Sequence, residues 1–381
     1  MPSETKDSLD GAIQRNSKGH PTGILSGDAT ALVADLIPPM TRKRKRRAYV
    51  RAAELYASRG WTNIHSMSTS PRDIPLLHEL ARDGKLKIRV YNSVKLRSNR
   101  PSRRLPPRND RDETHKNTLI TNNAITLYSD GSLTAGDAAM FAPYAEHGNN
   151  LGPLLLKPRQ THAVLDAALR NGVQVNTYAV GDRAVHTVLN WYEASFKRVP
   201  KEQWAKKTPR WRIEGADIIS SRDIPRFSKL DVIPSMQPSQ AIKNLDFATQ
   251  SLGTKRVNDA YIWQSLINSG SIIAGGSHAP IGKGDPRVEF YAATQRSDLK
   301  GYSPESWNND ERVTQEQALK MLTAWPALAA FQESKTGTLE VGKMADITIL
   351  DTDIMTADGP EILTSSPLIT MVEGRIVFDG R

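Results

Sequence analysis

The 381-residue sequence contains no cysteine and no long uninterrupted apolar stretch. Without cysteine the chain has no disulfide framework, no thiolate nucleophile and no cysteine-ligated zinc site. Without a run of about 18 apolar residues, no membrane partner is expected. The N-terminal sequence MPSETKDSLDGAIQRN lacks the apolar segment of a secretory signal, so we expect a cytoplasmic location.

The net charge of +10 is concentrated in two short segments. Residues 42–47 (RKRKRR) carry six positive charges, and residues 95–116 carry eight Lys and Arg against three acidic residues. The first segment leads into a helical pattern that ends at Gly60, which favours the solvated first turns of an amphipathic helix. A patch for nucleic acid or a protein partner is the alternative. No aromatic residue interleaves with either segment, so no nucleic-acid partner is expected.

Short apolar segments alternate with helical patterns through most of the chain. This alternation predicts an α/β fold, a TIM-like (β/α)8 barrel with a parallel sheet. The predicted strands are residues 61–65, 86–94, 123–128, 173–178, 210–214, 231–235 and 271–275. The clearest predicted helices are residues 158–171, 182–197, 219–229, 314–323 and 327–331. A complete barrel needs an eighth strand, and no segment before residue 61 has a convincing strand pattern.

The two ends of the chain differ from this middle part. Residues 1–40 are expected to form an extended lead-in with one short helix at 29–36. Residues 41–333 are assigned to the incomplete barrel. Residues 334–381 alternate apolar and polar side chains between glycine turns, which predicts a small β-sandwich portion.

The active site of a parallel barrel lies at the carboxyl ends of its strands. A catalytic metal needs about three His, Asp or Glu ligands, and the candidates there are His65, Asp130, Glu214 and His278, with Asp182 and His186 nearby. No His-x-His, His-x-x-His or Glu-x-x-His pair supports a metal site, so ordinary structural roles for the two strand-end histidines stay open. The sequence also lacks the Gly-x-Ser-x-Gly, P-loop and dinucleotide-binding motifs.

Several segments together resemble the metal-dependent amidohydrolases, in the branch similar to N-substituted formamide deformylase (amidohydrolase family three). The matching segments follow the family's order and cover residues 19–33, 127–144, 178–185, 211–219, 224–238, 275–286 and 322–351. The resemblance implies a (β/α)8 barrel flanked by a β-sandwich. It also implies hydrolysis of non-peptide C–N bonds by a metal-activated water, with zinc as the expected divalent metal.

The family's metal-site positions carry other residues in this chain. The resemblance places the bridging Lys at Thr126, two His ligands at Tyr178 and Gly215, and the catalytic Asp at His278. The family's first strand, with its His-x-His ligands, is expected upstream of Gly19, so the chain resembles a member truncated at its N-terminus.

Two functions therefore stay open. In the first, the chain hydrolyses a small amide-like substrate, with His278 as catalytic residue and His278 and His65 as metal ligands. The substrate pocket is then expected to contain Asp130, Tyr178, Arg212, Glu214, Gln237 and Ser277. In the second, the chain is a catalytically inactive family member or a binding protein without metal. Open strand edges also predict a cover formed by residues 1–39 or by a second copy in a homo-oligomer.

Overall fold

The computed structural model describes residues 2–7, 12–25, 27–96, 119–146, 148–305 and 307–381. They form two compact units, Met1–Ala48 and Tyr49–Arg381. The basic segment predicted at residues 95–116 lies outside the described residues except for Lys95 and Leu96. The predicted boundaries at residues 40 and 333 stay predictions.

The first unit contains a small hairpin and a short helical segment. Strands β1 (Ile13–Arg15) and β2 (Pro21–Leu25) pair in antiparallel fashion. The 3₁₀ helix η1 (Gly27–Thr30) leads into α1 (Ala31–Ala34), inside the range predicted for a short helix. Helix α2 (Arg42–Ser58) begins with the basic run, as predicted, and crosses the boundary between the units.

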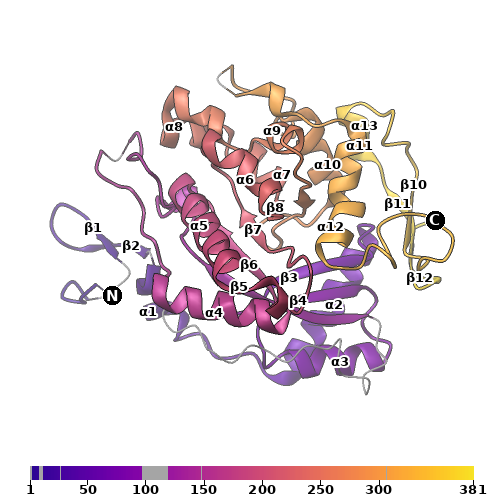
Figure 1. Cartoon of the computed structure of the whole chain (residues 1–381). Helices are drawn as coiled ribbons and strands as arrows, with labels where there is room; N and C mark the ends of the chain where they lie inside the picture. The colour runs from indigo at the N-terminus through magenta and orange to yellow at the C-terminus, as the bar shows by residue number, and fades with distance from the viewer. Residues whose placement is uncertain (1, 8–11, 26, 97–118, 147, 306) are drawn as a thin grey trace. The chain divides into compact units, whose positions relative to one another are not determined.

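The second unit is built on a seven-stranded parallel sheet whose strands follow one another in chain order (Figure 1). Each predicted strand is found at its expected place, which confirms the TIM-like architecture. The strands are β3 (Asn63–Thr69), β4 (Arg89–Lys95), β5 (Ile120–Tyr128), β6 (Gln174–Ala179), β7 (Arg212–Gly215), β8 (Ile233–Met236) and β9 (Ala274–Gly275).

Helices lie in most connections between successive strands, as βαβ units require. They are α3 (Ile74–Arg82), α4 (Pro158–Asn171), α5 (Asp182–Arg198), α6 (Ile224–Lys229), α7 (Pro238–Lys243), α8 (Leu245–Arg256) and α9 (Trp263–Asn268). Three further helices follow β9: α10 (Pro286–Gln295), α11 (Gln315–Leu322) and α12 (Ala324–Ala329). No described helix has both the length and the apolar character needed to cross a membrane.

Strand β3 differs from its prediction in a way that matters for the site. It was predicted to end at His65, but it continues to Thr69, which pairs with Val94 of β4. The polar residues Ser66 and Ser68 hid this continuation because they break the apolar pattern of the strand. His65 therefore lies inside the strand and deeper in the barrel than expected.

A three-stranded antiparallel sheet follows the barrel, as the alternating pattern predicted. Its strands are β10 (Ile347–Leu350), β11 (Pro367–Val372) and β12 (Arg375–Asp379), with α13 (Gly359–Thr364) between the first two. Glu373 and Gly374 have positive φ angles of 52° and 73°, so the two-residue turn matches the twist of its flanking strands.

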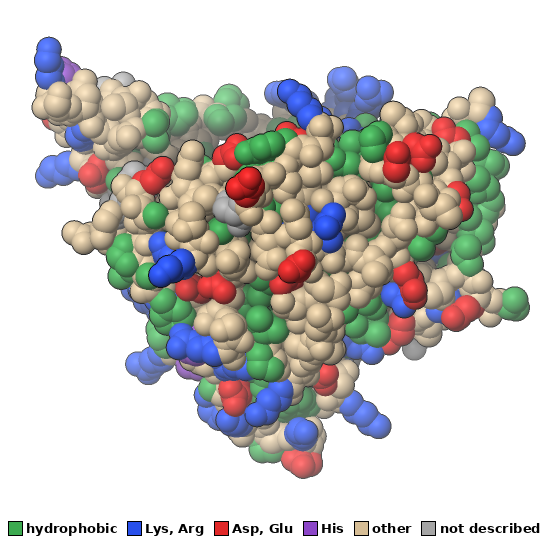
Figure 2. All heavy atoms as spheres, turned by 90° about the horizontal axis from the view of Figure 1, so that it is seen from above, with side chains coloured by type: hydrophobic (Ala, Val, Ile, Leu, Met, Phe, Trp, Pro, Cys, Tyr) green, Lys and Arg blue, Asp and Glu red, His purple; other side chains and the backbone are tan. Residues whose placement is uncertain are grey.

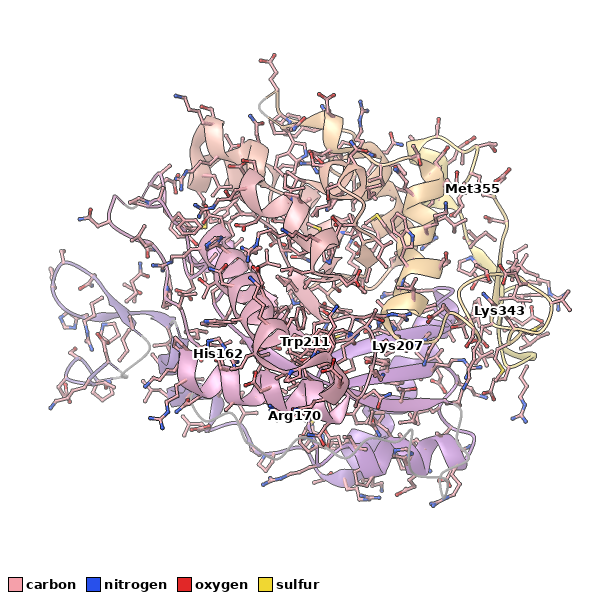
Figure 3. The ribbon with its side chains drawn as sticks, in the orientation of Figure 1. His162, Arg170, Lys207, Trp211, Lys343 and Met355 are labelled. Atoms are coloured by element: carbon pink, nitrogen blue, oxygen red, sulfur yellow. The ribbon has the colours of Figure 1, made fainter. Side chains whose placement is uncertain are left out.

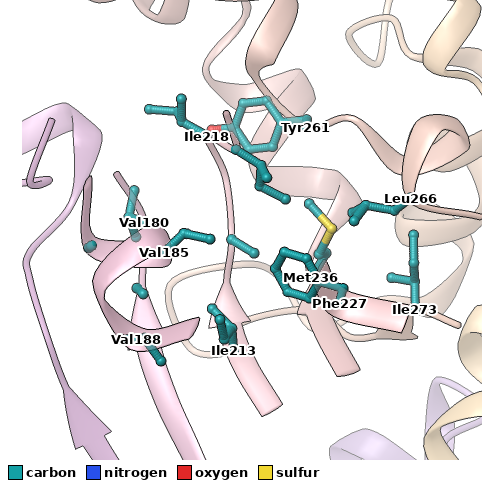
Figure 4. Packing of buried hydrophobic residues seen from close by; sticks show 14 of the residues in the cluster. Val180, Val185, Val188, Ile213, Ile218, Phe227, Met236, Tyr261, Leu266 and Ile273 are labelled. Carbon is teal, nitrogen blue, oxygen red and sulfur yellow. The ribbon is translucent and has the colours of Figure 1, made fainter. Parts of the chain in front are cut away.

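The main core fills the space between the parallel sheet and its outer helices (Figure 4). Val185 and Val188 of α5 pack toward Ile213 of β7, and Phe227 of α6 packs with Met236 of β8. These side chains are almost entirely buried. The core therefore supports the strands from outside and leaves the barrel interior to polar side chains.

The basic run at residues 42–47 forms the first turns of α2. On the face shown in Figure 2, basic and acidic side chains are interspersed. Among the residues of the basic run, Arg42, Lys43, Arg44 and Arg47 are exposed on the first turns of α2. This placement fits the solvated-helix interpretation.

Candidate functional site

A cavity of about 1380 Å³ lies at the carboxyl ends of the parallel strands. Small-molecule pockets commonly have volumes of about 300–1,000 Å³, so this one is large enough for a sizeable ligand. Nine of the candidate residues line it: His65, Thr126, Asp130, Tyr178, Arg212, Glu214, Gln237, Ser277 and His278. Their assigned roles remain predictions, but their convergence follows from the parallel topology.

Arg212 lies at the floor of this cavity on β7. Its side chain is fully buried, and its Nη1 donates a hydrogen bond to Nδ1 of His65 at 3.0 Å. Its guanidinium also lies 5.4 Å from the ring centre of Tyr91, within the range of a cation–π contact. Side chains of strands β3, β4 and β7 thus meet at the guanidinium group of Arg212.

The bond from Arg212 determines the protonation of His65. A guanidinium can only donate hydrogen bonds, so Nδ1 of His65 must accept and the ring proton must lie on Nε2. Burial, and secondly the positive charge of Arg212, hold the pKa of His65 well below its usual range. His65 is therefore a neutral hydrogen-bond donor whose Nδ1 lone pair is already in use.

Glu214 lies two residues after Arg212 on the same face of β7. It is 6% exposed, and burial raises the pKa of its carboxyl group, opposed by Arg212 and by a hydrogen bond from Ser235. Within the described residues, its Oε1 and the Nε and Nη2 atoms of Arg212 are buried without a hydrogen-bond partner. Such atoms are rare in folded proteins and need a partner.

Asp130 has a structural task in this cavity wall. Its Oδ2 accepts hydrogen bonds from the backbone N–H groups of Ala139 and Gly181, both at 2.9 Å, and its Oδ1 accepts from Val180 at 3.0 Å. The carboxylate thereby ties the segment after β5 to the β6–α5 turn. Asp130 was a candidate metal ligand, and in the structure it accepts three backbone N–H groups.

The remaining predicted residues surround the cavity mouth. His278 has a positive φ angle of 50°, and its ring centre lies 6.2 Å from that of Tyr178. Burial and the nearby Lys243 lower the pKa of His278, while burial raises that of Tyr178. Gln237 donates to the backbone carbonyl of Ser235 at 3.2 Å. Ser277 lies next to His278 in the cavity wall.

The described residues do not fit the metal site that the resemblance implied. They contain no group of three or more His, Asp or Glu residues placed to hold an ion. Thr126 is hydrogen-bonded to Ser93 at 2.6 Å. Gly215 has a φ angle of 89°, a conformation that would strain a histidine at the same position. His186 bonds to the buried Asp223 at 3.0 Å and does not line the cavity.

Sequence reasoning missed several residues in the barrel interior. Asn176 donates to Ser93 at 3.0 Å, and Tyr91 donates to Gln174 at 2.9 Å. All four are buried. Polar residues at every second position of β4 and β6 were the available indication, because alternate residues of a barrel strand face inward.

Buried carboxyl groups predict that stability depends on pH. Burial raises the pKa of Asp130 and of Asp217 to about 7 and that of Glu289 to about 8. Above the ordinary pKa of a carboxyl group, each of these three groups binds more protons in the folded chain than in the unfolded chain, so its contribution to the free energy of unfolding falls as pH rises toward its folded pKa. The slope is on the order of 1 kcal/mol per pH unit for each group.

Urea unfolding at several pH values measures this slope, and Glu289→Gln is expected to reduce it, most clearly between pH 5 and 8. The exposed Glu340→Gln is the matched control and is expected to retain the full slope. A stability that rises steadily from pH 4 to 8 contradicts this assignment.

Comparison with known proteins relates the chain to a protein family. The model of the amidohydrolase family matches residues 3–378. The chain is 27% identical to the protein LONG AFTER FAR-RED 3 of Arabidopsis thaliana over 98% of its own length and 64% of that protein. It is 25% identical to the putative amidohydrolase YtcJ of Bacillus subtilis (strain 168), over 98% of its own length and 69% of that protein.

Two further matches concern an enzyme and a solved structure. The chain is 25% identical to N-substituted formamide deformylase of Arthrobacter pascens over 60% of the chain and 41% of the enzyme. A metal-dependent hydrolase of Pyrococcus horikoshii OT3 superposes with a TM-score of 0.74 at 23% identity, covering 94% of this chain and 68% of that structure. The second match supports the fold alone.

Proposed function

Because this chain belongs to the amidohydrolase family, we propose that its cavity receives a small molecule with an amide-like C–N bond and that hydrolysis of this bond is its function. The observation that carries the proposal is the convergence of Arg212, Glu214 and Tyr178 in one cavity at the carboxyl ends of the strands. The chain spans less than two thirds of the length of the Arabidopsis relative, so that protein's own activity is not transferred to it.

The side chains in the cavity can bind and orient such a molecule. Arg212 offers N–H donors that suit a carbonyl oxygen, and Glu214 offers an acceptor that suits an amide N–H. Burial strengthens such hydrogen bonds because little water competes with them. The O–H of Tyr178 stays protonated, since burial raises its pKa, and it is a further donor on the cavity wall.

The family implies a divalent metal, and zinc is our proposal for its identity. A bound metal would polarise a carbonyl and activate water. The described donors do not fit such an ion, because no three His, Asp or Glu side chains among them are placed to hold one and Nδ1 of His65 already accepts from Arg212. No step of the reaction is therefore assigned to a metal held by these residues.

This disagreement favours a second candidate function, binding of the same small molecule without turnover. The substituted positions Thr126, Tyr178 and Gly215 offer no histidine or lysine ligand, and of the four substituted positions only His278 carries an imidazole. A cytoplasmic location and a homo-oligomer remain predictions in either case.

Metal analysis combined with an activity assay separates the two candidates. We expect a hydrolase to contain about one equivalent of zinc, iron or manganese after metal loading and to release the amine from N-formyl and N-acyl substrates. His278→Ala should then lower turnover by at least about 100-fold. His162→Ala on α4 (Figure 3), whose ring packs near Trp191, is the matched control that should retain turnover.

The same measurements can also reject the hydrolase proposal. If the metal-loaded chain binds amides but releases no amine, the binding candidate holds and the hydrolase proposal fails. If it neither binds nor cleaves them, both candidates fail.

A further inference from the structure

The first unit exposes a run of large apolar side chains to solvent. Every residue from 31 to 40 is exposed. Five of them are large and apolar: Leu32, Val33, Leu36, Ile37 and Met40. Leu36 and Ile37 are the most exposed of the five, at 78% and 68%. A continuous exposed apolar segment commonly marks an interaction surface, because its contact with water is unfavourable.

A basic run follows this apolar segment after a single residue. That residue, Thr41, begins the next helix: its Oγ1 accepts the N–H of Arg44 at 3.3 Å, and its carbonyl oxygen accepts the N–H of Lys45 at 2.9 Å. Residues 42–47 then form the first turns of α2 with no acidic residue among them. Positive charges oppose the dipole at a helix N-terminus, so this run does not serve the stability of the helix itself.

We propose that residues 32–47 form a docking surface for a membrane that contains anionic phospholipids. The apolar side chains of residues 32–40 enter the boundary between headgroups and acyl chains, and the basic side chains of residues 42–47 lie against the negatively charged headgroups. Apolar insertion and charge attraction both contribute to such binding. The expectation of no membrane partner rested on the lack of a spanning segment, and a segment that lies in the interface needs none.

Two other partners suit only part of this surface. A nucleic acid would attract the basic run but leave the apolar side chains in water, and residues 32–47 contain no aromatic side chain that could stack on bases. A second copy of the chain could cover the apolar segment, but a symmetric contact would bring two runs of six positive charges together. An anionic membrane surface suits both segments.

Sedimentation of the full chain with lipid vesicles tests this proposal. We expect binding to phosphatidylcholine vesicles with about 30% phosphatidylserine to be at least about tenfold tighter than to phosphatidylcholine alone, because each basic residue near an anionic surface adds to the attraction. Raising the salt concentration from about 0.1 to about 0.5 M should weaken this binding at least about tenfold, since salt screens the attraction.

A pair of charge reversals tests the basic run. Arg44→Glu with Arg47→Glu is expected to weaken binding to the anionic vesicles at least about tenfold and to reduce its salt dependence. Lys229→Glu with Lys255→Glu is the matched control, because it changes the charge equally at exposed positions of the second unit. The control is expected to keep the affinity within about twofold.

A second pair of substitutions tests the apolar segment. Leu36→Ser with Ile37→Ser is expected to weaken binding at least about tenfold while its salt dependence stays. Val341→Ser with Ile376→Ser, which removes exposed apolar side chains from the second unit, is the matched control and is expected to retain the affinity of the unaltered chain.

The possible outcomes decide the proposal in either direction. Weaker binding of both test pairs, with both control pairs unchanged, supports it. Equal binding to neutral and anionic vesicles, or binding to neither, overturns it. An affinity of the Leu36→Ser, Ile37→Ser pair equal to that of the unaltered chain also overturns it. Binding of a DNA duplex without binding of vesicles assigns the basic run to nucleic acid instead.

Discussion

Asp346→Ala is expected to lower the free energy of unfolding by about 3–5 kcal/mol, because it leaves a buried arginine without its main partner. Arg89 of β4 is 4% exposed, and its Nε and Nη2 lie 2.5 and 3.1 Å from the two oxygens of Asp346. Asp346 also accepts the backbone N–H of Glu373 at 2.9 Å. The carboxylate therefore joins the barrel to the turn between β11 and β12.

Urea unfolding monitored by tryptophan fluorescence measures this loss. Asp379→Ala, which removes an exposed carboxylate from the same small sheet, is the control and is expected to leave the midpoint unchanged. The double variant Arg89→Met with Asp346→Leu is expected to recover much of the stability, because an apolar pair leaves no buried charge behind. A midpoint for Asp346→Ala equal to that of the control contradicts the account of this contact.

Asp130→Ala is the second large effect, with an expected loss of about 3 kcal/mol or more. The substitution leaves the N–H groups of Ala139, Val180 and Gly181 without their acceptor, and each unsatisfied buried donor costs about 1–3 kcal/mol. Asp130→Asn keeps one side-chain oxygen and is expected to cost less.

Hydrogen exchange identifies the origin of this loss. The amides of the three donors are expected to exchange faster in Asp130→Ala at pH 6, where the folded core remains intact. Asp137→Ala, in the same loop but only partly buried, is the control and is expected to change stability by no more than about 0.5 kcal/mol. Unchanged exchange at all three amides in Asp130→Ala is incompatible with a structural role of this carboxylate.

The positions of the strands could be predicted because each buried parallel strand is a short apolar run between helical patterns. Helix 158–171 was placed correctly because Pro158 begins it and Gly172, with a φ angle of 65°, follows its end. The predicted end of β3 at His65 was wrong, because the strand continues to Thr69 through Ser66 and Ser68, which break the apolar pattern.

The chemistry of the site was harder to predict than its location. The topology brings the candidate residues into one cavity, because parallel strands end at the same edge of the sheet. It does not reveal hydrogen-bond partners. The bond from Arg212 to His65 joins residues 147 positions apart, and Asp130 accepts from backbone groups that have no side-chain signature. The sequence could therefore suggest His65 and Asp130 as metal ligands, whereas in the structure His65 is hydrogen-bonded to Arg212 and Asp130 accepts backbone N–H groups.

The chain has no cysteine, so its cavity is built from other polar side chains. The cavity floor depends on an arginine, a histidine and a glutamate, whose positions are determined by β3 and β7. Arg212 donates to His65, and its Nε and Nη2 are buried without a hydrogen-bond partner among the described residues. We propose that these side chains take the recognition role that the family resemblance assigns to a metal.

The central claim is that the cavity floor binds an amide-like group through Arg212, His65 and Glu214. The most direct measurement is the ¹⁵N spectrum of histidine-labelled protein, with His65 assigned from a His65→Gln variant. We predict one neutral tautomer with its proton on Nε2, a shift of Nε2 when benzamide is added, and no shift of either ring nitrogen when zinc is added. A proton on Nδ1, or coordination of zinc by His65, would contradict the account.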